Sequence, residues 1–570
     1  MAIEKTRNLA ETGDWPWLGA YPAGIDWHAA YPGRPIHELL LDAAARHGDK
    51  PCLDFMGRGW SYRGIGDRVR RAAMGLRTLG VRKGTRVGLL LPNSPTYVVA
   101  YFAVAMAGGT VVNLNPLYAA PEIRRLAEDS GIEVLITLDV KQLYQLAAPL
   151  LDGTALKTIV VERMADLLPT AKSLLYRLLK RGDTASWPRD ARHLDFRALV
   201  ANDGTAPAAT IDPERDVAVL QYTGGTTGEP KGAMLTHANL WANTRQCLAW
   251  LAQMPEGMER VLCVLPFFHV FAMTGAMNIG IANGAELLLM PRFTIDDLFR
   301  LIRRKRPTYL PGVPTLYTAI YSHPKAKSVD LSSIRICISG GASLPLEVKT
   351  KFEQATGCKL LEGYGLSETA PVLTVNPLHG VARPGSAGLP VPGTIIEVTA
   401  LDDATAVLPR GERGEICARG PQVMAGYWQK PAETAAVMVG GRFHTGDVGY
   451  VDEDGYLFIV DRIKDIIIAG GYNIYPRMVE EAIYQHPKVA QAIVIGVPDQ
   501  YRGQNVKAVV QPKPGETITE TELLDFLKER VSVIERPRII EFRAALPMTP
   551  IGKPDKKALL AEEAGKQPPP

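Results

Sequence analysis

The feature of this chain that most constrains its fold is a recurring pattern of short apolar segments that end in glycine-rich loops. One such segment, residues 217–221, precedes the loop 222–232, and another, residues 334–338, precedes Gly340-Gly341. Short continuous apolar segments bounded by turn residues are typical of strands in a parallel sheet that helices cover on both faces. The pattern therefore predicts a large α/β body.

The size and charge of the chain narrow the class of protein. At about 100–200 residues per domain, a chain of 570 residues should form several domains. Its 64 Lys and Arg residues barely exceed its 60 Asp and Glu residues, which disfavours a nucleic-acid-binding surface. Hydrophobic residues make up 46% of the chain and charged residues 22%, as in soluble globular proteins. These proportions favour an enzyme.

The cysteines and the N-terminus bear on the cellular compartment. The cysteines are far apart and form no CxxC cluster of the kind that zinc and redox sites require. They are Cys52, Cys247, Cys263, Cys337, Cys358 and Cys417. We expect reduced, mostly buried thiols. Because the N-terminus also carries no apolar stretch of signal-peptide length, the sequence predicts a cytoplasmic protein.

Three segments raise the question of membrane contact. Residues 87–121 and 261–285 carry no Asp, Glu, Lys or Arg, but prolines and glycines interrupt both, so we expect buried strands and short helices there. Residues 167–181 alternate apolar and basic residues at helical spacing. The spacing favours an ordinary surface helix over the core. The alternative is peripheral contact with the inner face of a membrane.

The secondary-structure pattern that the sequence predicts changes twice after the α/β body. Between about residues 385 and 455 short strands alternate with glycine turns, which predicts a small β subdomain. After residues 461–465 the pattern becomes α+β over a stretch long enough to fold by itself. We therefore expect a large N-terminal domain over residues 1–460 and a small C-terminal domain over residues 466–570.

A loop rich in glycine and threonine directly follows the apolar segment 217–221. Its residues are Thr223, Gly224, Gly225, Thr226, Thr227, Gly228, Glu229, Pro230 and Lys231. Glycines let backbone N–H groups approach a ligand, the hydroxyls add donors, and the lysine adds positive charge. The spacing is not that of a Walker A loop. The composition predicts polyphosphate binding, and the alternative is an ordinary surface loop.

This loop resembles the signature loop of the AMP-forming acyl-activating superfamily, which contains acyl-CoA synthetases, luciferases and peptide-synthetase adenylation domains. Further motifs match in the same order: Pro266-Phe267-Phe268-His269, Glu362-Gly363-Tyr364-Gly365-Leu366-Ser367-Glu368-Thr369, Gly414-Glu415-Ile416, Thr445-Gly446-Asp447, Asp461-Arg462-Ile463-Lys464-Asp465 and Pro547-Met548-Thr549-Pro550-Ile551-Gly552-Lys553. Within the superfamily the chain resembles bacterial long-chain fatty-acyl-CoA synthetases. The resemblance implies two α/β sheet layers and a β subdomain, a hinge at residues 461–465 and a small, mobile α+β C-terminal domain.

The resemblance also implies how ATP and AMP are bound. Glu368 offers the carboxylate oxygen that Mg²⁺ prefers, Tyr364 offers a flat face to adenine, and Asp447 offers the acceptors that two ribose hydroxyls require. The expected nucleotide-binding residues are Thr223, Gly224, Gly225, Thr226, Thr227, Lys231, Gly340, Gly341, Ala342, Glu362, Gly363, Tyr364, Gly365, Ser367, Asp447 and Arg462.

Three residues are expected to act in the reaction itself. By resemblance, Lys553 bridges the substrate carboxylate and the α-phosphate, and His269 lies beside the carboxylate site. Lys464 is the hinge about which the small domain rotates between the two steps. The residues expected to line the tunnel for the coenzyme A thiol are Gly470, Gly471 and Tyr472, and those expected to line the acyl pocket are Phe271, Met273 and Thr274.

The expected reaction is a two-step ligation: a carboxylate and MgATP form an acyl-adenylate, and coenzyme A then takes the acyl group. Val270 disfavours a peptide-synthetase domain, which typically carries an aspartate there. A luciferase-type oxidation and a non-enzymatic descendant are further alternatives. A medium- or long-chain fatty acid is the favoured substrate, ahead of a dicarboxylate such as pimelate and an aryl acid. We expect these small molecules as partners, no nucleic acid, and a monomer or homodimer.

Overall fold

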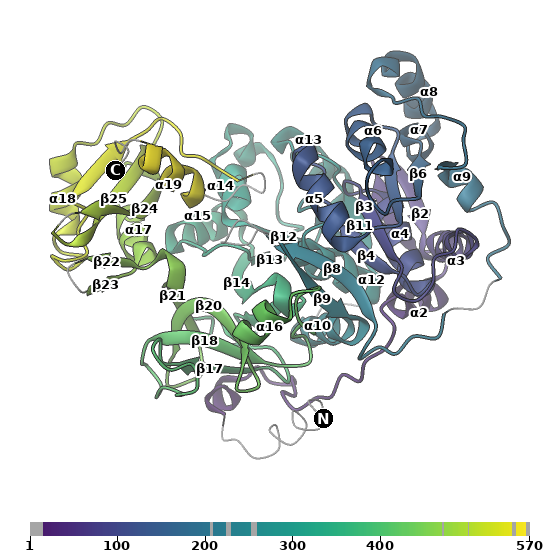
Figure 1. Ribbon diagram of the computed structural model, residues 1–570. Coiled ribbons are helices and arrows are strands. Elements are labelled where there is room, and N and C mark those ends of the chain that lie inside the picture. The colour runs from purple at the N-terminus through teal and green to yellow at the C-terminus, as the bar shows by residue number, and fades with distance from the viewer. Residues whose placement is uncertain are drawn as a thin grey trace.

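The chain folds into four sheets with helices packed around them (Figure 1). The computed structural model describes residues 15–205, 209–223, 230–251, 259–469, 472–499, 501–549 and 555–565. Two large, mostly parallel sheets form the body, an antiparallel sheet lies beside them, and the C-terminal residues form a separate sheet with its own helices. The predicted α/β fold, with a β subdomain and a smaller α+β C-terminal part, is confirmed.

The first large sheet has nine strands. In order across the sheet they are β16 (Leu389–Pro390), β15 (Val372–Val375), β14 (Lys359–Gly365), β13 (Ile336–Ser339), β12 (Tyr309–Gly312), β10 (Arg260–Cys263), β11 (Glu286–Leu289), β1 (Pro51–Phe55) and β2 (Arg58–Ser61). The six strands from β14 to β1 run parallel, so their carboxyl ends meet at one edge. In such sheets ligands bind at that edge, where β13 and β14 carry predicted nucleotide-binding residues.

The second large sheet has seven strands. They are β7 (His193–Asp195), β6 (Thr158–Glu162), β5 (Val134–Leu138), β3 (Arg86–Leu90), β4 (Thr110–Asn113), β8 (Val217–Thr223) and β9 (Lys231–Thr236). Between β3 and β4 lies α4 (Pro95–Met106), whose twelve residues are all buried in the core that the two sheets share. The strand, helix, strand prediction for residues 87–121 is therefore confirmed.

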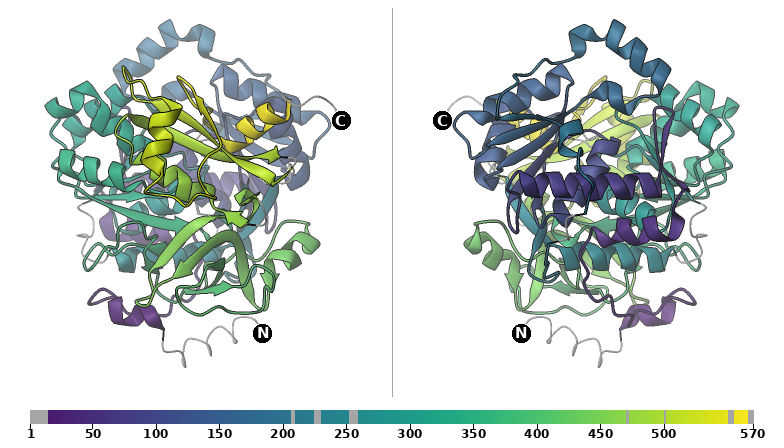
Figure 2. Two further views of the ribbon diagram at one scale, coloured as in Figure 1. Left: turned by 90° about the vertical axis from the view of Figure 1, so that its left-hand side faces the viewer. Right: turned by 90° about the vertical axis from the view of Figure 1, so that its right-hand side faces the viewer.

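The other helices of the body pack around and between the two large sheets, as the two side views in Figure 2 show. They are α2 (Glu38–His47), α3 (Tyr62–Thr78), α5 (Ala120–Ser130), α6 (Lys141–Ala147), α7 (Met164–Leu167), α8 (Thr170–Leu179), α9 (Phe196–Leu199), α10 (His237–Trp250), α11 (Val270–Ala272), α12 (Ile279–Ala282), α13 (Ile295–Lys305), α14 (Pro314–Ser322) and α15 (Leu346–Thr356). No helix among the described residues is long and apolar enough to cross a bilayer. All six cysteines are buried free thiols, as predicted.

Two smaller sheets follow along the chain. The β subdomain contains β17 (Ile395–Thr399), β18 (Gly414–Arg419), β19 (Met438–Val439), β20 (Arg442–Val451) and β21 (Leu457–Arg462), with α16 (Pro431–Val437) beside them. The C-terminal part contains β22 (Ile467–Ala469), β23 (Tyr472–Ile474), β24 (Val489–Asp499), β25 (Gly503–Pro512) and β26 (Ile539–Phe542), with α17 (Pro476–Tyr484), α18 (Glu520–Leu527) and α19 (Lys556–Gly565). This part has an apolar core of its own, as an independently folding unit requires.

One expectation about the surface is wrong. The spacing of residues 167–181 predicts a helix over the core, and α8 is indeed helical. None of its residues is fully buried, however, because the helix packs mainly on α7 at the rim of the body and only Tyr176 reaches the main core. Its leucines face solvent.

Candidate functional site

Asp447 lies at the centre of the predicted nucleotide site. It is a buried residue of β20, 4% exposed, and the Tyr364 hydroxyl donates a hydrogen bond of 2.6 Å to its Oδ2. Arg462 Nε lies 3.0 Å from its Oδ1. Burial raises the pKa of Asp447, and the Arg462 guanidinium opposes that rise by stabilising the carboxylate. Tyr364 and Arg462 thus hold the carboxylate from two sides, so its orientation is set before any ligand arrives.

A second carboxylate, that of Glu415 on β18, hydrogen-bonds the backbone next to Asp447 and so positions it. Glu415 Oε1 accepts a hydrogen bond of 3.0 Å from Gly446 N, and its Oε2 lies 2.8 Å from His444 Nδ1. The register between β18 and β20 shifts at this point, and Gly446 has a φ of 73°. The sequence placed Glu415 in a family motif but assigned it no role. The structure shows that it fastens the bulge from which Asp447 projects.

Glu368 and Lys231 both contact the side chain of Tyr427. The Tyr427 hydroxyl donates a hydrogen bond of 2.8 Å to Glu368 Oε1, and Lys231 Nζ lies 5.4 Å from the centroid of the Tyr427 ring. Glu368 Oε2 has no hydrogen-bond partner among the described residues. Burial raises the pKa of Glu368. A carboxylate with one open oxygen, hydrogen-bonded to the same tyrosine that a lysine contacts, fits a divalent cation that is shared with phosphate groups.

One predicted ligand and one cluster of three side chains bear on metal binding. Glu368 is the predicted Mg²⁺ ligand, and its open oxygen fits that role. Among the described residues one further group, Glu415, Cys417 and His444, brings potential ligand atoms within 4.8 Å of one another. Both Glu415 oxygens already have protein partners, so this group is best explained as a hydrogen-bond network that supports the bulge.

The predicted adenine-binding residues lie at the carboxyl ends of β13 and β14. Glu362 is buried, and its Oε1 accepts a hydrogen bond of 3.1 Å from Leu344 N, which ties β14 to the loop after β13. Burial raises the pKa of Glu362 to about 7. A Cβ atom on Gly365 would come within 1.9 Å of Pro371 O, so only glycine fits there. Gly340, Gly341 and Ala342 lie in the loop after β13, Gly363 lies in β14, and Ser367 begins the short 3-10 helix that follows β14.

Buried amide side chains hold the loop that carries His269. Asn93 Oδ1 accepts a hydrogen bond of 2.7 Å from Phe267 N, and Gln221 Nε2 donates one of 3.1 Å to Phe268 O. His269 itself is half-buried and caps α11. Sequence reasoning missed both amides. One sequence feature could have indicated them: a polar residue near the end of β8 and another shortly after β3. At these carboxyl ends of parallel strands, side chains lie at the edge of the sheet where ligands bind.

The acyl-pocket candidates contact both nucleotide loops. Phe271 lies against Gly340: a Cβ atom on Gly340 would come within 3.1 Å of Phe271 Cζ. Met273 and Thr274 are buried at the start of a π-helix, Met273–Asn278. The Thr274 hydroxyl donates a hydrogen bond of 2.8 Å to Ala370 O, two residues after Glu368. Their role as the lining of an acyl tunnel stays a prediction.

The candidates near the C-terminal part differ in exposure. Lys464 is exposed, and Tyr472 is 58% exposed. Asp461, which belongs to the predicted hinge motif but was given no role of its own, accepts hydrogen bonds from Arg462 N (2.8 Å) and Arg477 N (2.7 Å) and so joins β21 to α17. The remaining predicted residues lie outside the described residues. They are Gly224, Gly225, Thr226, Thr227, Gly470, Gly471 and Lys553.

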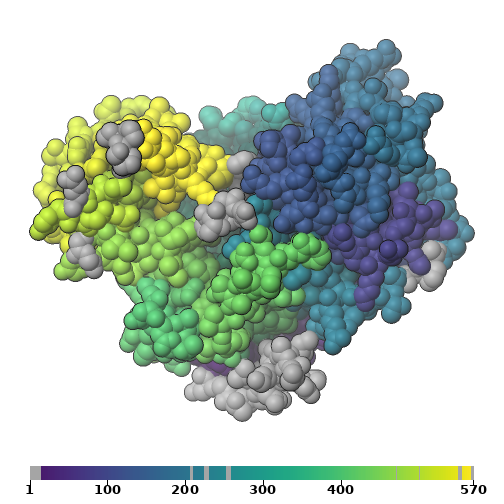
Figure 3. All heavy atoms as spheres, in the orientation of Figure 1, coloured from purple at the N-terminus to yellow at the C-terminus, as the bar shows by residue number. Residues whose placement is uncertain are grey.

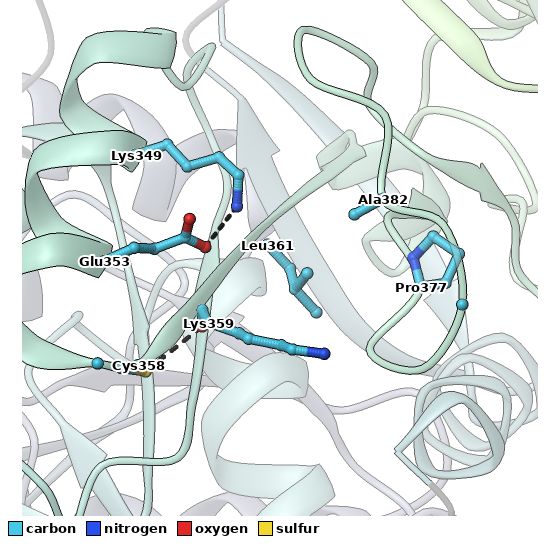
Figure 4. A pocket seen from close by; sticks show the side chains of 9 residues that line it. Lys349, Glu353, Cys358, Lys359, Leu361, Pro377 and Ala382 are labelled. Carbon is cyan, nitrogen blue, oxygen red and sulfur yellow. Dashed lines mark hydrogen bonds and ion pairs between the residues drawn. The ribbon is translucent and has the colours of Figure 1, made fainter.

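A cavity of about 330 Å³ lies beside β14 but contains none of the predicted site residues (Figure 4). Its lining is Lys349, Glu353, Gly357, Cys358, Lys359, Leu361, Pro377, Gly380 and Ala382. Lys349 is paired with Glu353, and Lys359 Nζ donates to Leu378 O at 3.0 Å. Its charged groups are thus satisfied by the protein, unlike the open carboxylate oxygen of Glu368.

The fold and the site agree with comparisons to known proteins. A family model described as AMP-binding enzyme matches residues 40–428, and one described as AMP-binding enzyme C-terminal domain matches residues 478–553. The layered sheets and the motifs at their ligand edge define a nucleotide-dependent enzyme with a separate C-terminal domain. The chain belongs to the AMP-binding enzyme family.

Individual relatives cover almost the whole chain. A long-chain-fatty-acid–CoA ligase of Bacillus subtilis is 44% identical over 96% of this chain and 98% of its own length. A feruloyl-CoA synthase of Amycolatopsis is 37% identical over 92% of this chain and 96% of its own length. The crystal structure of ATP-bound MatB from Rhodopseudomonas palustris is 29% identical, with a TM-score of 0.81, over 93% of this chain and 99% of that chain.

Proposed function

We propose that this protein is an acyl-CoA synthetase that activates a medium- or long-chain fatty acid. The observation that carries the proposal is the convergence of Asp447, Glu368 and Lys231 around β14, which suits ribose, Mg²⁺ and phosphate on one ligand. Similarity to long-chain-fatty-acid–CoA ligases over 96% of the chain supports the choice of acid and of coenzyme A.

In the first step a carboxylate oxygen of the fatty acid attacks the α-phosphorus of ATP. The new bond joins the acyl oxygen to phosphorus, and pyrophosphate leaves. Glu368 would hold Mg²⁺, which neutralises phosphate charge when bound. Asp447 accepts hydrogen bonds from the ribose hydroxyls. Lys553 bridges the carboxylate of the fatty acid and the α-phosphate, and His269 lines the carboxylate site. Alignment and charge neutralisation supply the catalysis, without a covalent enzyme intermediate.

In the second step the coenzyme A sulfur attacks the acyl carbon of the adenylate. The carbon–oxygen bond to AMP breaks, the thiol proton is released, and acyl-CoA and AMP are the products. Rotation of residues 466–570 about the hinge 461–465, with Lys464 at its centre, would remove Lys553 and bring Gly470, Gly471 and Tyr472 to the site. One set of nucleotide contacts then serves two conformations.

An aryl acid is the second candidate substrate, because a feruloyl-CoA synthase is 37% identical to the chain. A dicarboxylate such as pimelate is a third. Its far carboxylate would have to be buried without a partner in an apolar tunnel, which is costly. Phe271, Met273 and Thr274 offer no cation to such a group.

The test is an assay of coenzyme-A-dependent AMP release across monocarboxylates from C4 to C18, with heptanoate against pimelate and with ferulate. Burial of each methylene contributes about 0.8 kcal/mol, so kcat/KM should rise roughly fourfold per CH₂ until the tunnel ends. Pimelate clearly better than heptanoate would promote the dicarboxylate reading, and ferulate better than every fatty acid would promote the aryl reading.

A further inference from the structure

Helix α8 presents its apolar side to solvent. Four leucines, Leu174, Leu175, Leu178 and Leu179, are between 54% and 71% exposed, and no residue of the helix is buried. We call these four residues the leucine face. Single exposed leucines are normal on protein surfaces, but a contiguous group of four marks a place of contact.

The orientation of α8 is set by its opposite side. At 100° per residue the leucine face spans an arc of about 140°. Ser173 and Tyr176, the two half-buried residues of the helix, lie opposite that arc, and Tyr176 packs against the main core. An ordinary surface helix buries its apolar arc. In α8 the arrangement is inverted.

The leucine face lies at an extremity of the molecule. In Figure 1, α8 projects beyond the sheets at the upper right, and Figure 3 shows the same end of the body protruding. Lys172 Nζ donates a hydrogen bond of 2.7 Å to Met56 O. Met56 lies at the tip of the hairpin that joins β1 to β2, so this tip lies beside the helix. Met56 is itself 39% exposed, so this tip adds one more exposed apolar side chain close to the helix.

The charge around the leucine face is mostly positive. Between residues 166 and 183 the chain carries two acidic residues, Asp166 and Asp183, and four basic ones, Lys172, Arg177, Lys180 and Arg181. Asp166 pairs with Arg177 at 3.0 Å and Asp183 pairs with Lys180 at 2.8 Å. Four basic and two acidic residues give this segment +2 of the chain's formal net charge of +4. Apolar side chains ringed by lysine and arginine match the layering of an anionic lipid surface, with acyl chains inside and charged headgroups outside.

We propose that the leucine face docks the protein onto an anionic lipid bilayer. The leucines enter the acyl boundary, and the four basic residues meet the headgroups. A second copy of the chain is the less suitable occupant, because contact between two such helices would bring two segments of net positive charge together. Docking extends the proposed reaction, since a long-chain fatty acid dissolves in the bilayer, but the surface itself does not depend on which acid is activated.

The experiment is flotation of the full chain with vesicles, which reads binding without any turnover. We expect the wild type to float with vesicles of mixed phosphatidylcholine and phosphatidylglycerol and much less with phosphatidylcholine alone. Leu175→Glu/Leu178→Glu should reduce the vesicle partition coefficient by roughly 100-fold, since each leucine leaves an apolar environment. Lys180→Glu/Arg181→Glu should weaken binding to the anionic vesicles only.

The matched control is Leu401→Glu/Val407→Glu, which changes two exposed apolar residues between β17 and β18, far along the chain from α8. It should float like the wild type. Adenylation of octanoate in solution shows whether each variant is folded. Absence of flotation by the wild type, or equal losses in the leucine and control variants, would overturn the proposal. So would a leucine variant that floats normally but loses a dimer seen in wild-type sedimentation, which would assign the face to a second copy.

Discussion

The nucleotide side and the C-terminal side of the candidate site are built differently. Asp447 and Glu368 are largely enclosed, and Tyr364 and Tyr427 fix their carboxylates by hydrogen bonds of 2.6 and 2.8 Å. On the C-terminal side, Lys464 is exposed and Tyr472 is 58% exposed. Groups that must be in place throughout a reaction are held rigidly, whereas groups that take turns at one site need freedom to leave it.

This difference leads to a simple expectation for mutations. Changes on the nucleotide side should impair both steps of the proposed reaction, because ATP, the acyl-adenylate and AMP share the same contacts. Changes on the C-terminal side should impair one step and spare the other.

Lys553→Ala should give the largest effect. We expect acyl-adenylate formation to slow by roughly 10²–10³, the usual loss when a charge-stabilising donor is removed. Thioester formation from supplied acyl-AMP should survive. Pyrophosphate release and acyl-AMP consumption measure the two steps separately. Lys557→Ala, four residues further along, is the control and should retain both. An equal loss in both steps for Lys553→Ala would remove this lysine from the first conformation.

Asp447→Asn should raise the KM for ATP by roughly 10- to 100-fold, because hydrogen bonds to a charged acceptor contribute about 1.5–3 kcal/mol. Both half-reactions should weaken together, in contrast to the lysine variant. The control is Asp452→Asn, which lies just after β20 and pairs with Arg383 outside the site. An unchanged KM for ATP in Asp447→Asn would show that the ribose binds elsewhere.

Lys464→Pro should impair transfer to coenzyme A more than adenylation, since proline fixes φ in the segment about which the small domain rotates. If it disfavours the rotated state by about 1.4 kcal/mol, transfer falls about tenfold. Lys464→Ala removes the same side chain but keeps backbone freedom and should act like the wild type. Equal turnover for both variants and the wild type would exclude Lys464 as the hinge.

Glu415→Ala tests whether the bulge positions Asp447. It removes the hydrogen bonds to Gly446 N and His444, each worth about 1 kcal/mol. We expect up to about a tenfold rise in the KM for ATP with kcat nearly unchanged, and Glu415→Gln should restore part of the loss. A fall in kcat alone, with the KM for ATP intact, would contradict a positioning role.

Glu362→Gln should give the smallest effect, visible as a dependence of stability on pH. Burial raises the pKa of Glu362 from 4.5 to about 7 in the folded protein. Between these two values the folded state binds more protons than the unfolded state, so the contribution of Glu362 to stability falls as pH rises. Glutamine does not titrate. The Tm of the variant minus that of the wild type should therefore increase from about pH 5 to about pH 7.5. The same Tm difference at the two pH values would contradict the raised pKa of Glu362.

Part of the fold and of the candidate site can be predicted from the sequence, and part cannot. The interruptions in residues 87–121 predict β3, α4 and β4 because proline and glycine act locally. The amides Asn93 and Gln221 gain their role only when segments far apart in the chain meet at one edge, which no local pattern reveals. The leucines of α8 have the spacing of a buried face, and their exposure depends on where the fold leaves the helix. Local sequence patterns predict secondary-structure elements and motif residues. The residues that hold those motif residues in position depend on tertiary contacts.

In the proposed reaction one nucleotide site serves two successive steps through an acyl-adenylate. Rapid-quench analysis of the wild type with ATP and palmitate, without coenzyme A, tests whether this intermediate forms. We expect acyl-AMP and pyrophosphate to form up to the concentration of enzyme, with no free AMP. Once coenzyme A is added, AMP and palmitoyl-CoA should be released stoichiometrically. Formation of ADP, or acyl-CoA produced without an acyl-AMP that accumulates and is then consumed, would contradict the proposed reaction.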